Sequence, residues 1–93
     1  DFIKQLKVKN ITPILIAAPC HPDFLRMLSK TVEKENHQIV TALAKRHGLQ
    51  YWDYSRFGIR DGAFFNPDHL NYEGAQLFTK ELERRMTQTF PTY

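Results

Sequence analysis

The stretch Ile14-Leu15-Ile16-Ala17-Ala18-Pro19-Cys20-His21-Pro22 contains the residues that decide the fold. Residues 14–18 form an uninterrupted apolar run, which predicts a strand buried on both faces, as in a parallel sheet covered by helices. The prolines that follow end this strand at its carboxyl end, the edge where open α/β sheets bind ligands. We therefore expect His21 to line a substrate site at that edge.

A helical segment follows the strand. Pro22 suits the first helical position, and apolar residues then recur at helical spacing as Leu25, Leu28, Val32, Ile39 and Leu43. Asn36 falls on this stripe, which predicts either a break into a short and a long helix or a position near solvent. The run Lys45-Arg46-His47-Gly48 predicts the helix end, because basic residues complement the helix dipole and glycine adopts the left-handed conformation.

A second strand is predicted at residues 49–54, which contain three aromatic side chains. The distance along the chain from Ala18 to Gln50 suits a β-α-β crossover, so we expect the two strands to pair in parallel. Ser55 then lies at the same sheet edge as His21 and is a candidate substrate-binding residue. It lacks the glycine-flanked turn of a nucleophilic serine, so a role in a turn or cap is favoured.

The last third of the chain places a histidine just before a helix. Asn71 is a good N-cap and Glu73 lies in the first turn, so the helix is predicted to start near Tyr72. His69 is thereby held outside the positive end of the helix dipole, which disfavours the imidazolium form. A histidine in this position is suited to accept a proton.

Residues 67–78, PDHLNYEGAQLF, resemble the last conserved block of SGNH/GDSL-type hydrolases and related O-acetyltransferases. The resemblance implies a flavodoxin-like α/β sandwich in which a serine attacks an acyl ester and His69 is the catalytic base. An acid three residues before the histidine usually orients the ring in that superfamily. Asn66 occupies this position and is a candidate substrate-binding residue, and Asp68 is the candidate carboxylate beside His69.

These observations predict an α/β fold, namely a partial flavodoxin-like, SGNH-type three-layer sandwich with a short parallel sheet flanked by helices. Residues 1–93 are expected to form a single domain that is the C-terminal fragment of a larger SGNH-like domain, because the nucleophile block would lie upstream of Asp1. The expected partners are the missing N-terminal half of the domain and, in the parent, an acylated small molecule or carbohydrate. The chain alone should be inactive.

Two other functions stay open. One is a catalytically degenerate SGNH-like module that binds carbohydrate or a protein partner, and the other is a plain flavodoxin-like structural module. Since two parallel strands do not form a stable sheet alone, a homodimer through the open sheet edge is also expected.

Composition limits the chemistry further. Among 93 residues there is one cysteine, so an internal disulfide and a four-cysteine zinc site are excluded. His21, His69 and Asp68 lack a further ligand at suitable spacing, and we expect no metal and no cofactor. The net charge is +3, and the basic residues are interspersed with acidic residues, which argues against nucleic-acid binding. No apolar run is long enough to cross a bilayer, and both cytoplasmic and periplasmic or extracytoplasmic locations stay open.

Overall fold

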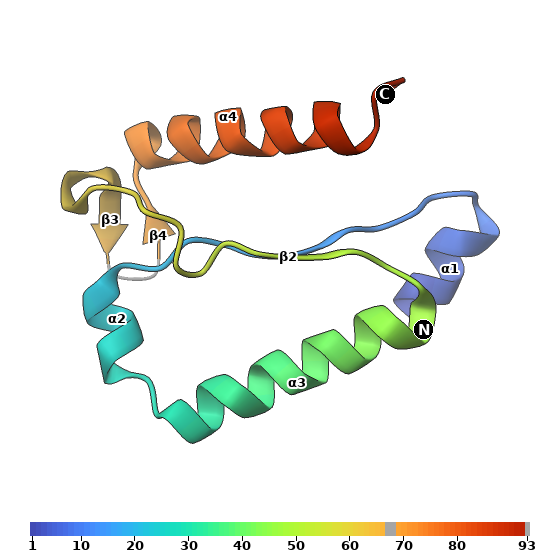
Figure 1. Ribbon diagram of the computed structural model, residues 1–93, viewed down its shortest axis with the longest axis horizontal. Helices are drawn as coiled ribbons and strands as arrows, with labels where there is room; N and C mark the ends of the chain where they lie inside the picture. Colours follow the sequence, from blue (N-terminus) through green and yellow to red (C-terminus); the bar gives the residue numbers. More distant parts are fainter. Residues whose placement is uncertain (67–68, 93) are drawn as a thin grey trace. The chain divides into compact units, whose positions relative to one another are not determined.

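The computed structural model describes residues 1–66 and 69–92, and their contacts divide the chain into two compact units. Unit 1 consists of Asp1–Ala18 and Met27–Ser55, and unit 2 of Pro19–Arg26 and Arg56–Tyr93. The chain contains both helices and strands, and one pair of strands is parallel (Figure 1). The α/β class expected from the sequence is confirmed at this level.

Unit 1 contains the parallel strand pair. Its elements are α1 (Phe2–Val8), β1 (Leu15–Ala17), α3 (Lys30–His47) and β2 (Tyr51–Asp53). Ile16 is paired with Trp52 at the centre of the two strands, as the predicted β-α-β crossover requires. Trp52 is only 1% exposed and is the largest fully buried side chain among the described residues. The predicted parallel pair is therefore confirmed.

The burial of β1 differs from the prediction. Ile16 is 43% exposed, and its neighbours Leu15 and Ala17 are half-buried. The expectation of a strand buried on both faces is wrong for the described residues, because the sheet that contains β1 has only two strands there. An apolar side chain in the middle of a strand is left partly in contact with water.

The helical segment between the two strands is broken before Ser29, and the second alternative given for Asn36, a position near solvent, is confirmed. The short helix α2 (Pro22–Met27) ends before Ser29, whose hydroxyl accepts a hydrogen bond from the Val32 amide and caps α3. Asn36 lies exposed inside α3 instead of at the break. The predicted end of α3 is confirmed, since Gly48 has a φ of 65° and closes the helix in the left-handed conformation.

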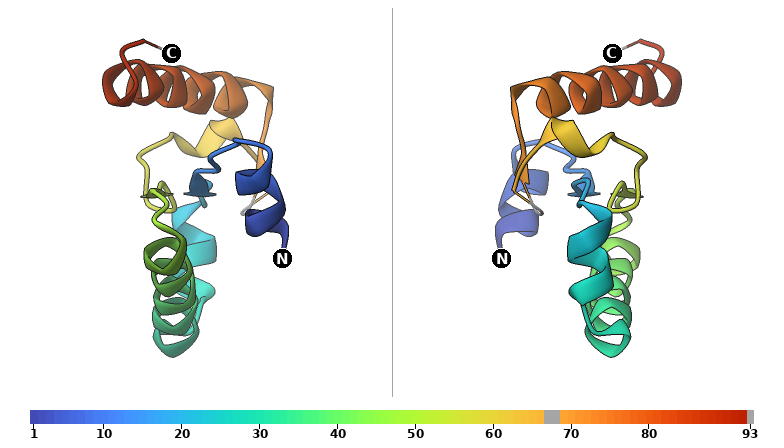
Figure 2. Two further views of the ribbon diagram at one scale, coloured as in Figure 1. Left: turned by 90° about the vertical axis from the view of Figure 1, so that its right-hand side faces the viewer. Right: turned by 90° about the vertical axis from the view of Figure 1, so that its left-hand side faces the viewer.

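Unit 2 contains α2 up to Arg26, the 3-10 turn η1 (Asp61–Ala63), the antiparallel strands β3 (Phe64–Asn66) and β4 (His69–Leu70), and the helix α4 (Tyr72–Thr89). Residues 57–65 include η1 and most of β3. Both views of Figure 2 show η1, in yellow, against the orange start of α4. This contact positions the residues of the candidate site.

Candidate active site

His69 and Asn66 face each other across the β3–β4 pair. They are partners in the antiparallel register, and partners of this kind bring their side chains within contact distance. Nδ1 of His69 lies 2.8 Å from Oδ1 of Asn66. The ring is exposed and the amide is half-buried. The position three residues before the histidine therefore holds a group that contacts the ring, but the group is an amide.

This contact is compatible with the tautomer of His69 in which Nδ1 carries the proton. An amide oxygen has no proton to give, so in that tautomer Nδ1 donates to Oδ1 of Asn66. In the neutral ring Nε2 is then the unprotonated nitrogen and can accept a proton from a hydroxyl. The arrangement has the geometry of a general base held by an uncharged partner.

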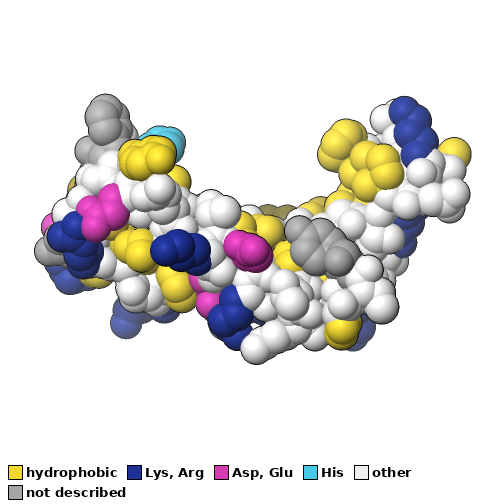
Figure 3. All heavy atoms as spheres, turned by 90° about the horizontal axis from the view of Figure 1, so that it is seen from above, with side chains coloured by type: hydrophobic (Ala, Val, Ile, Leu, Met, Phe, Trp, Pro, Cys, Tyr) yellow, Lys and Arg dark blue, Asp and Glu magenta, His cyan; other side chains and the backbone are white. Residues whose placement is uncertain are grey.

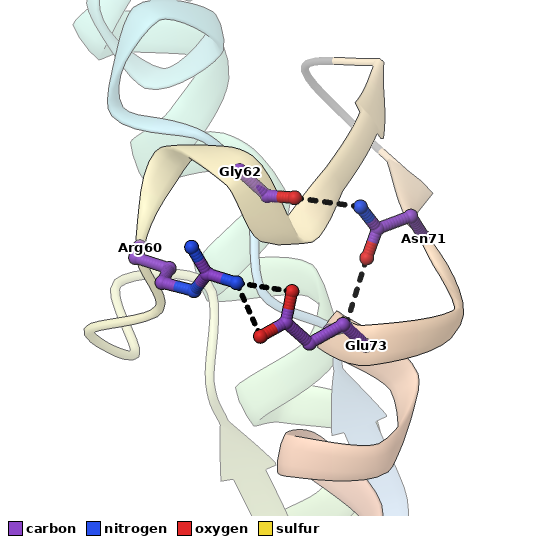
Figure 4. A network of polar contacts seen from close by, with 5 residues as sticks. Arg60, Gly62, Asn71 and Glu73 are labelled. Carbon is purple, nitrogen blue, oxygen red and sulfur yellow. Dashed lines mark hydrogen bonds and ion pairs between the residues drawn. The ribbon is translucent and has the colours of Figure 1, made fainter.

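Asn71 anchors the chain directly after His69. Its Oδ1 accepts a hydrogen bond from the Gly74 amide at 3.0 Å, which caps α4 as predicted. Its Nδ2 donates to the Gly62 carbonyl at 2.7 Å (Figure 4), and its backbone amide donates to the Ala63 carbonyl at 2.9 Å. One residue thus joins the first turn of α4 to η1.

Gly74 allows the first turn of α4 to approach η1 closely. A Cβ atom at this position would lie 2.1 Å from the Ala63 carbonyl oxygen and 2.9 Å from Cδ2 of Leu70. Ala63 itself is fully buried beneath the helix. Gly74 is buried, whereas Ala75, the next residue, is exposed. Only glycine fits at this point of contact.

Arg60 and Glu73 form a second link between the same two elements. One nitrogen of the Arg60 guanidinium, Nη2, donates to both carboxylate oxygens of Glu73, as drawn in Figure 4. The hydrogen bond from Arg60 holds the pKa of Glu73 below its ordinary value, and the same bond raises the pKa of Arg60. Glu73 also lies in the first turn of α4, where the helix dipole favours a negative charge.

His21 is placed at the start of α2. Its Nδ1 accepts a hydrogen bond from the Asp23 amide at 3.0 Å, so the imidazole caps this short helix. Its ring meets the ring of Phe64 edge-on, with the centroids 5.3 Å apart. Phe64 belongs to β3, the strand that also carries Asn66. The predicted role of His21 in substrate binding stays a prediction, beside the structural role that these contacts give it.

Ser55 lies two residues after the end of β2, as expected, and belongs to unit 1. Its hydroxyl donates to Oδ1 of Asp53 at 2.6 Å, and its amide donates to the same oxygen at 2.9 Å. This is the turn role favoured by the sequence, and substrate binding by Ser55 stays a prediction. Asp68, the predicted orienting carboxylate, lies outside the described residues.

The sequence did not indicate three residues that hold the site together. Arg60, Gly62 and Ala63 contribute the charge and the two carbonyl groups that meet the start of α4. The Asp61-Gly62 dipeptide is typical of a turn, but neither this dipeptide nor Arg60 indicates a hydrogen-bond partner many residues away along the chain.

Other types of site are not seen in the described parts of the chain. No group of three or more His, Cys, Asp or Glu side chains in residues 1–66 and 69–92 could hold a metal ion. Nor does this part of the chain contain a helix long and apolar enough to span a membrane. On the face drawn in Figure 3, Lys and Arg side chains are interspersed with Asp and Glu side chains.

A protein-family model, that of an uncharacterised family, matches residues 1–91. No curated protein and no solved structure matches the chain.

Proposed function

We propose that this chain, which belongs to the uncharacterised family matched over residues 1–91, is the C-terminal part of a serine-dependent acyl-ester hydrolase or O-acetyltransferase, in which His69 is the general base. The observation that carries the proposal is the 2.8 Å contact between Nδ1 of His69 and Oδ1 of Asn66. It leaves Nε2 as the proton-accepting nitrogen of an exposed ring.

The chemistry follows from that nitrogen. Nε2 of His69 takes the proton of a hydroxyl as the hydroxyl oxygen bonds to the acyl carbon. The same nitrogen then returns the proton to the departing alkoxide when the ester bond breaks. Asn66 keeps the ring oriented and its Nδ1 protonated throughout. Because an amide carries no net charge, it stabilises the imidazolium intermediate less strongly than a carboxylate would.

The attacking serine is expected from outside these residues. The chain has two serines, Ser29 and Ser55, and both make local structural bonds: Ser29 caps α3 and Ser55 bonds to Asp53. We therefore expect the 93 residues to supply the base, and the missing N-terminal half of the domain to supply the nucleophile. The parallel β1–β2 pair with its helical crossover is the unit from which a flavodoxin-like sandwich is built, which supports this assignment.

An acetyl-ester assay tests the proposal. We expect no turnover of a chromogenic acetyl ester by the 93-residue chain, and turnover by a longer form of the protein that also contains the nucleophile. In that longer form, His69→Ala should abolish turnover and His37→Ala, on α3, should leave it unchanged. Turnover by the 93-residue chain that disappears with His69→Ala would show that no outside nucleophile is needed. Full activity of His69→Ala in the longer form would refute the proposal that His69 is the general base.

The role of Asn66 has its own test. Asn66→Ala should lower kcat by about a hundredfold, because a misdirected base loses the near-attack geometry. Asn66→Asp should keep activity and move the acidic limb of the pH–rate profile to higher pH, since a carboxylate favours protonated imidazole. Asp68→Asn is the matched comparison. If Asp68→Asn lowers kcat strongly and Asn66→Ala does not, Asp68 orients the ring and our assignment of Asn66 is wrong.

The second candidate function is that of a catalytically degenerate module that binds carbohydrate or a protein partner. It is favoured by the amide at the position where the SGNH/GDSL superfamily usually has an acid. A plain flavodoxin-like structural module is the remaining alternative. A longer form of the protein that binds an acetylated sugar without turning it over, equally well with and without His69→Ala, would support the binding function.

The exposed apolar strand supports an expectation about assembly. Ile16 is 43% exposed in the middle of β1, and the described sheet stops at two strands. We propose that the 93-residue chain pairs through this edge with a second copy when its N-terminal half is missing. Light scattering that gives a strict monomer, or a dimer that Ile16→Lys does not disrupt, would contradict this pairing.

A further inference from the structure

His47 is a buried ionisable residue that the proposed reaction does not use. It lies in the last turn of α3, and its side chain is 7% exposed. Its Nε2 is buried and has no hydrogen-bond partner among the described residues. A polar ring atom in this position has lost its contact with water without gaining a direct bond, so adding a proton to the ring is costly.

The groups around the ring come from α1 and from α3 itself. On the side of α1 lie Asp1, Lys4 and Lys7, and α3 contributes Arg46. Oδ2 of Asp1 is 3.7 Å from Nε2 of His47, which is too long for a hydrogen bond, and its Oδ1 accepts a bond from the Ile3 amide. The single carboxylate is therefore partly committed to capping α1, while the three cations oppose a further positive charge.

Burial and these cations act in the same direction. Burial contributes most to lowering the pKa of His47, followed by Lys7, Arg46 and Lys4. The packed state consequently binds a proton at His47 less readily than a state in which the ring is in water. By linkage, the packing is fully present above the ordinary histidine value of 6.5 and is lost as the pH falls through the lowered value.

The same residue holds α1 in place. Nζ of Lys7 donates to the backbone carbonyl of His47, at the negative end of α3. Ile3 of α1 and Ala44 of α3 are both buried. The hydrogen bond from Lys7 to the end of α3 thus goes to the residue whose ring is sensitive to protonation.

We propose that His47 is a pH-sensitive latch that keeps α1 packed on the end of α3 while its ring is neutral and releases α1 when the ring is protonated. Release moves His47 into water, frees Lys7 from the carbonyl and exposes the apolar side chain of Ile3. The device goes beyond the proposed acyl transfer, and it lies in unit 1, whereas His69 lies in unit 2.

Hydrogen exchange of the α1 amides tests the latch. We compare the protein at about pH 7.5 and about pH 5.5, on either side of the ordinary histidine value, after correcting for the intrinsic exchange rate. The α1 amides should be protected at the higher pH and lose protection at the lower pH. His47→Gln, which cannot be protonated, should show the same protection at both. His37→Gln, an exposed histidine of the same helix, should behave like the unchanged protein.

Two outcomes would overturn the latch. One is equal protection of α1 at both pH values in the unchanged protein. The other is a loss of protection at low pH that persists in His47→Gln, which would assign the effect to a group other than His47. Should His47→Gln leave α1 unprotected throughout, NMR titration of the unchanged protein decides. The midpoint of the His47 ring resonances must then coincide with the midpoint of the α1 amide shifts, and separate midpoints refute the latch.

Discussion

Replacing Gly74 by alanine is the most direct test of how the candidate site is supported. The added methyl group would lie 2.1 Å from the Ala63 carbonyl oxygen, a distance at which the backbone of η1 must move. Movement of η1 lengthens the bonds from Asn71 to the Ala63 and Gly62 carbonyls, which are now 2.9 and 2.7 Å. The close packing that buries Ala63 is lost with them.

The magnitude follows from three effects. Each lost hydrogen bond costs about 1 kcal/mol, overpacking costs about 1–3 kcal/mol, and the better helix propensity of alanine returns about 1 kcal/mol. We therefore expect Gly74→Ala to lower the free energy of unfolding by about 2–4 kcal/mol. The measurement is urea denaturation followed by far-ultraviolet circular dichroism.

Gly58→Ala is the matched control, because a Cβ at Gly58 would meet nothing within 4 Å. Its free energy of unfolding should stay within about 0.5 kcal/mol of the unchanged protein. If Gly74→Ala is as stable as Gly58→Ala, then η1 does not rest on the first turn of α4. The contact between η1 and α4 would then no longer account for the position of His69.

Two further predictions concern the core and the pH dependence of stability. Trp52→Ala should lower the free energy of unfolding by about 3–5 kcal/mol, because the side chain is 1% exposed. The measurement is urea denaturation, and a loss below about 1 kcal/mol would contradict the place of Trp52 in the core. For Glu73, the bond from Arg60 lowers the pKa below the ordinary value of 4.5, so its stabilising effect is fully present above pH 4.5 and is lost as the pH falls through the lowered value. Thermal midpoints measured from neutral to acidic pH should fall less steeply for Glu73→Gln than for the unchanged protein, and identical slopes would show that the Arg60 pair does not couple to folding.

The sequence predicted those elements whose signals are local. The apolar run before Pro19 predicted β1, and Asn71 predicted the start of α4, because strand hydrophobicity and N-caps are properties of a few adjacent residues. The end of α3 followed from Gly48 in the same way. The break before α3 lies at Ser29, whose cap signal was obscured by the apolar stripe that continues past it, while Asn36 took the solvent-exposed position that was the other alternative.

Features that depend on distant partners could not be predicted. Spacing placed Asn66 where an orienting group belongs, but only the β3–β4 pairing brings its oxygen to His69. The exposure of Ile16 depends on how many strands join the sheet, which no local pattern encodes. The need for glycine at position 74 depends on a carbonyl eleven residues earlier, at Ala63, and sequence alone gives no distance to it.

The shortness of β4 has a consequence for anyone who wishes to redesign this protein. A single residue, Leu70, separates His69 from Asn71, the N-cap of α4. The start of this helix therefore sets the orientation of the imidazole. Inserting one amino acid between His69 and Asn71 would turn the ring to the opposite side of the strand, because successive side chains in a strand alternate. A different reactive group can therefore be introduced by changing the side chain at position 69, but not by changing the length of the chain around it.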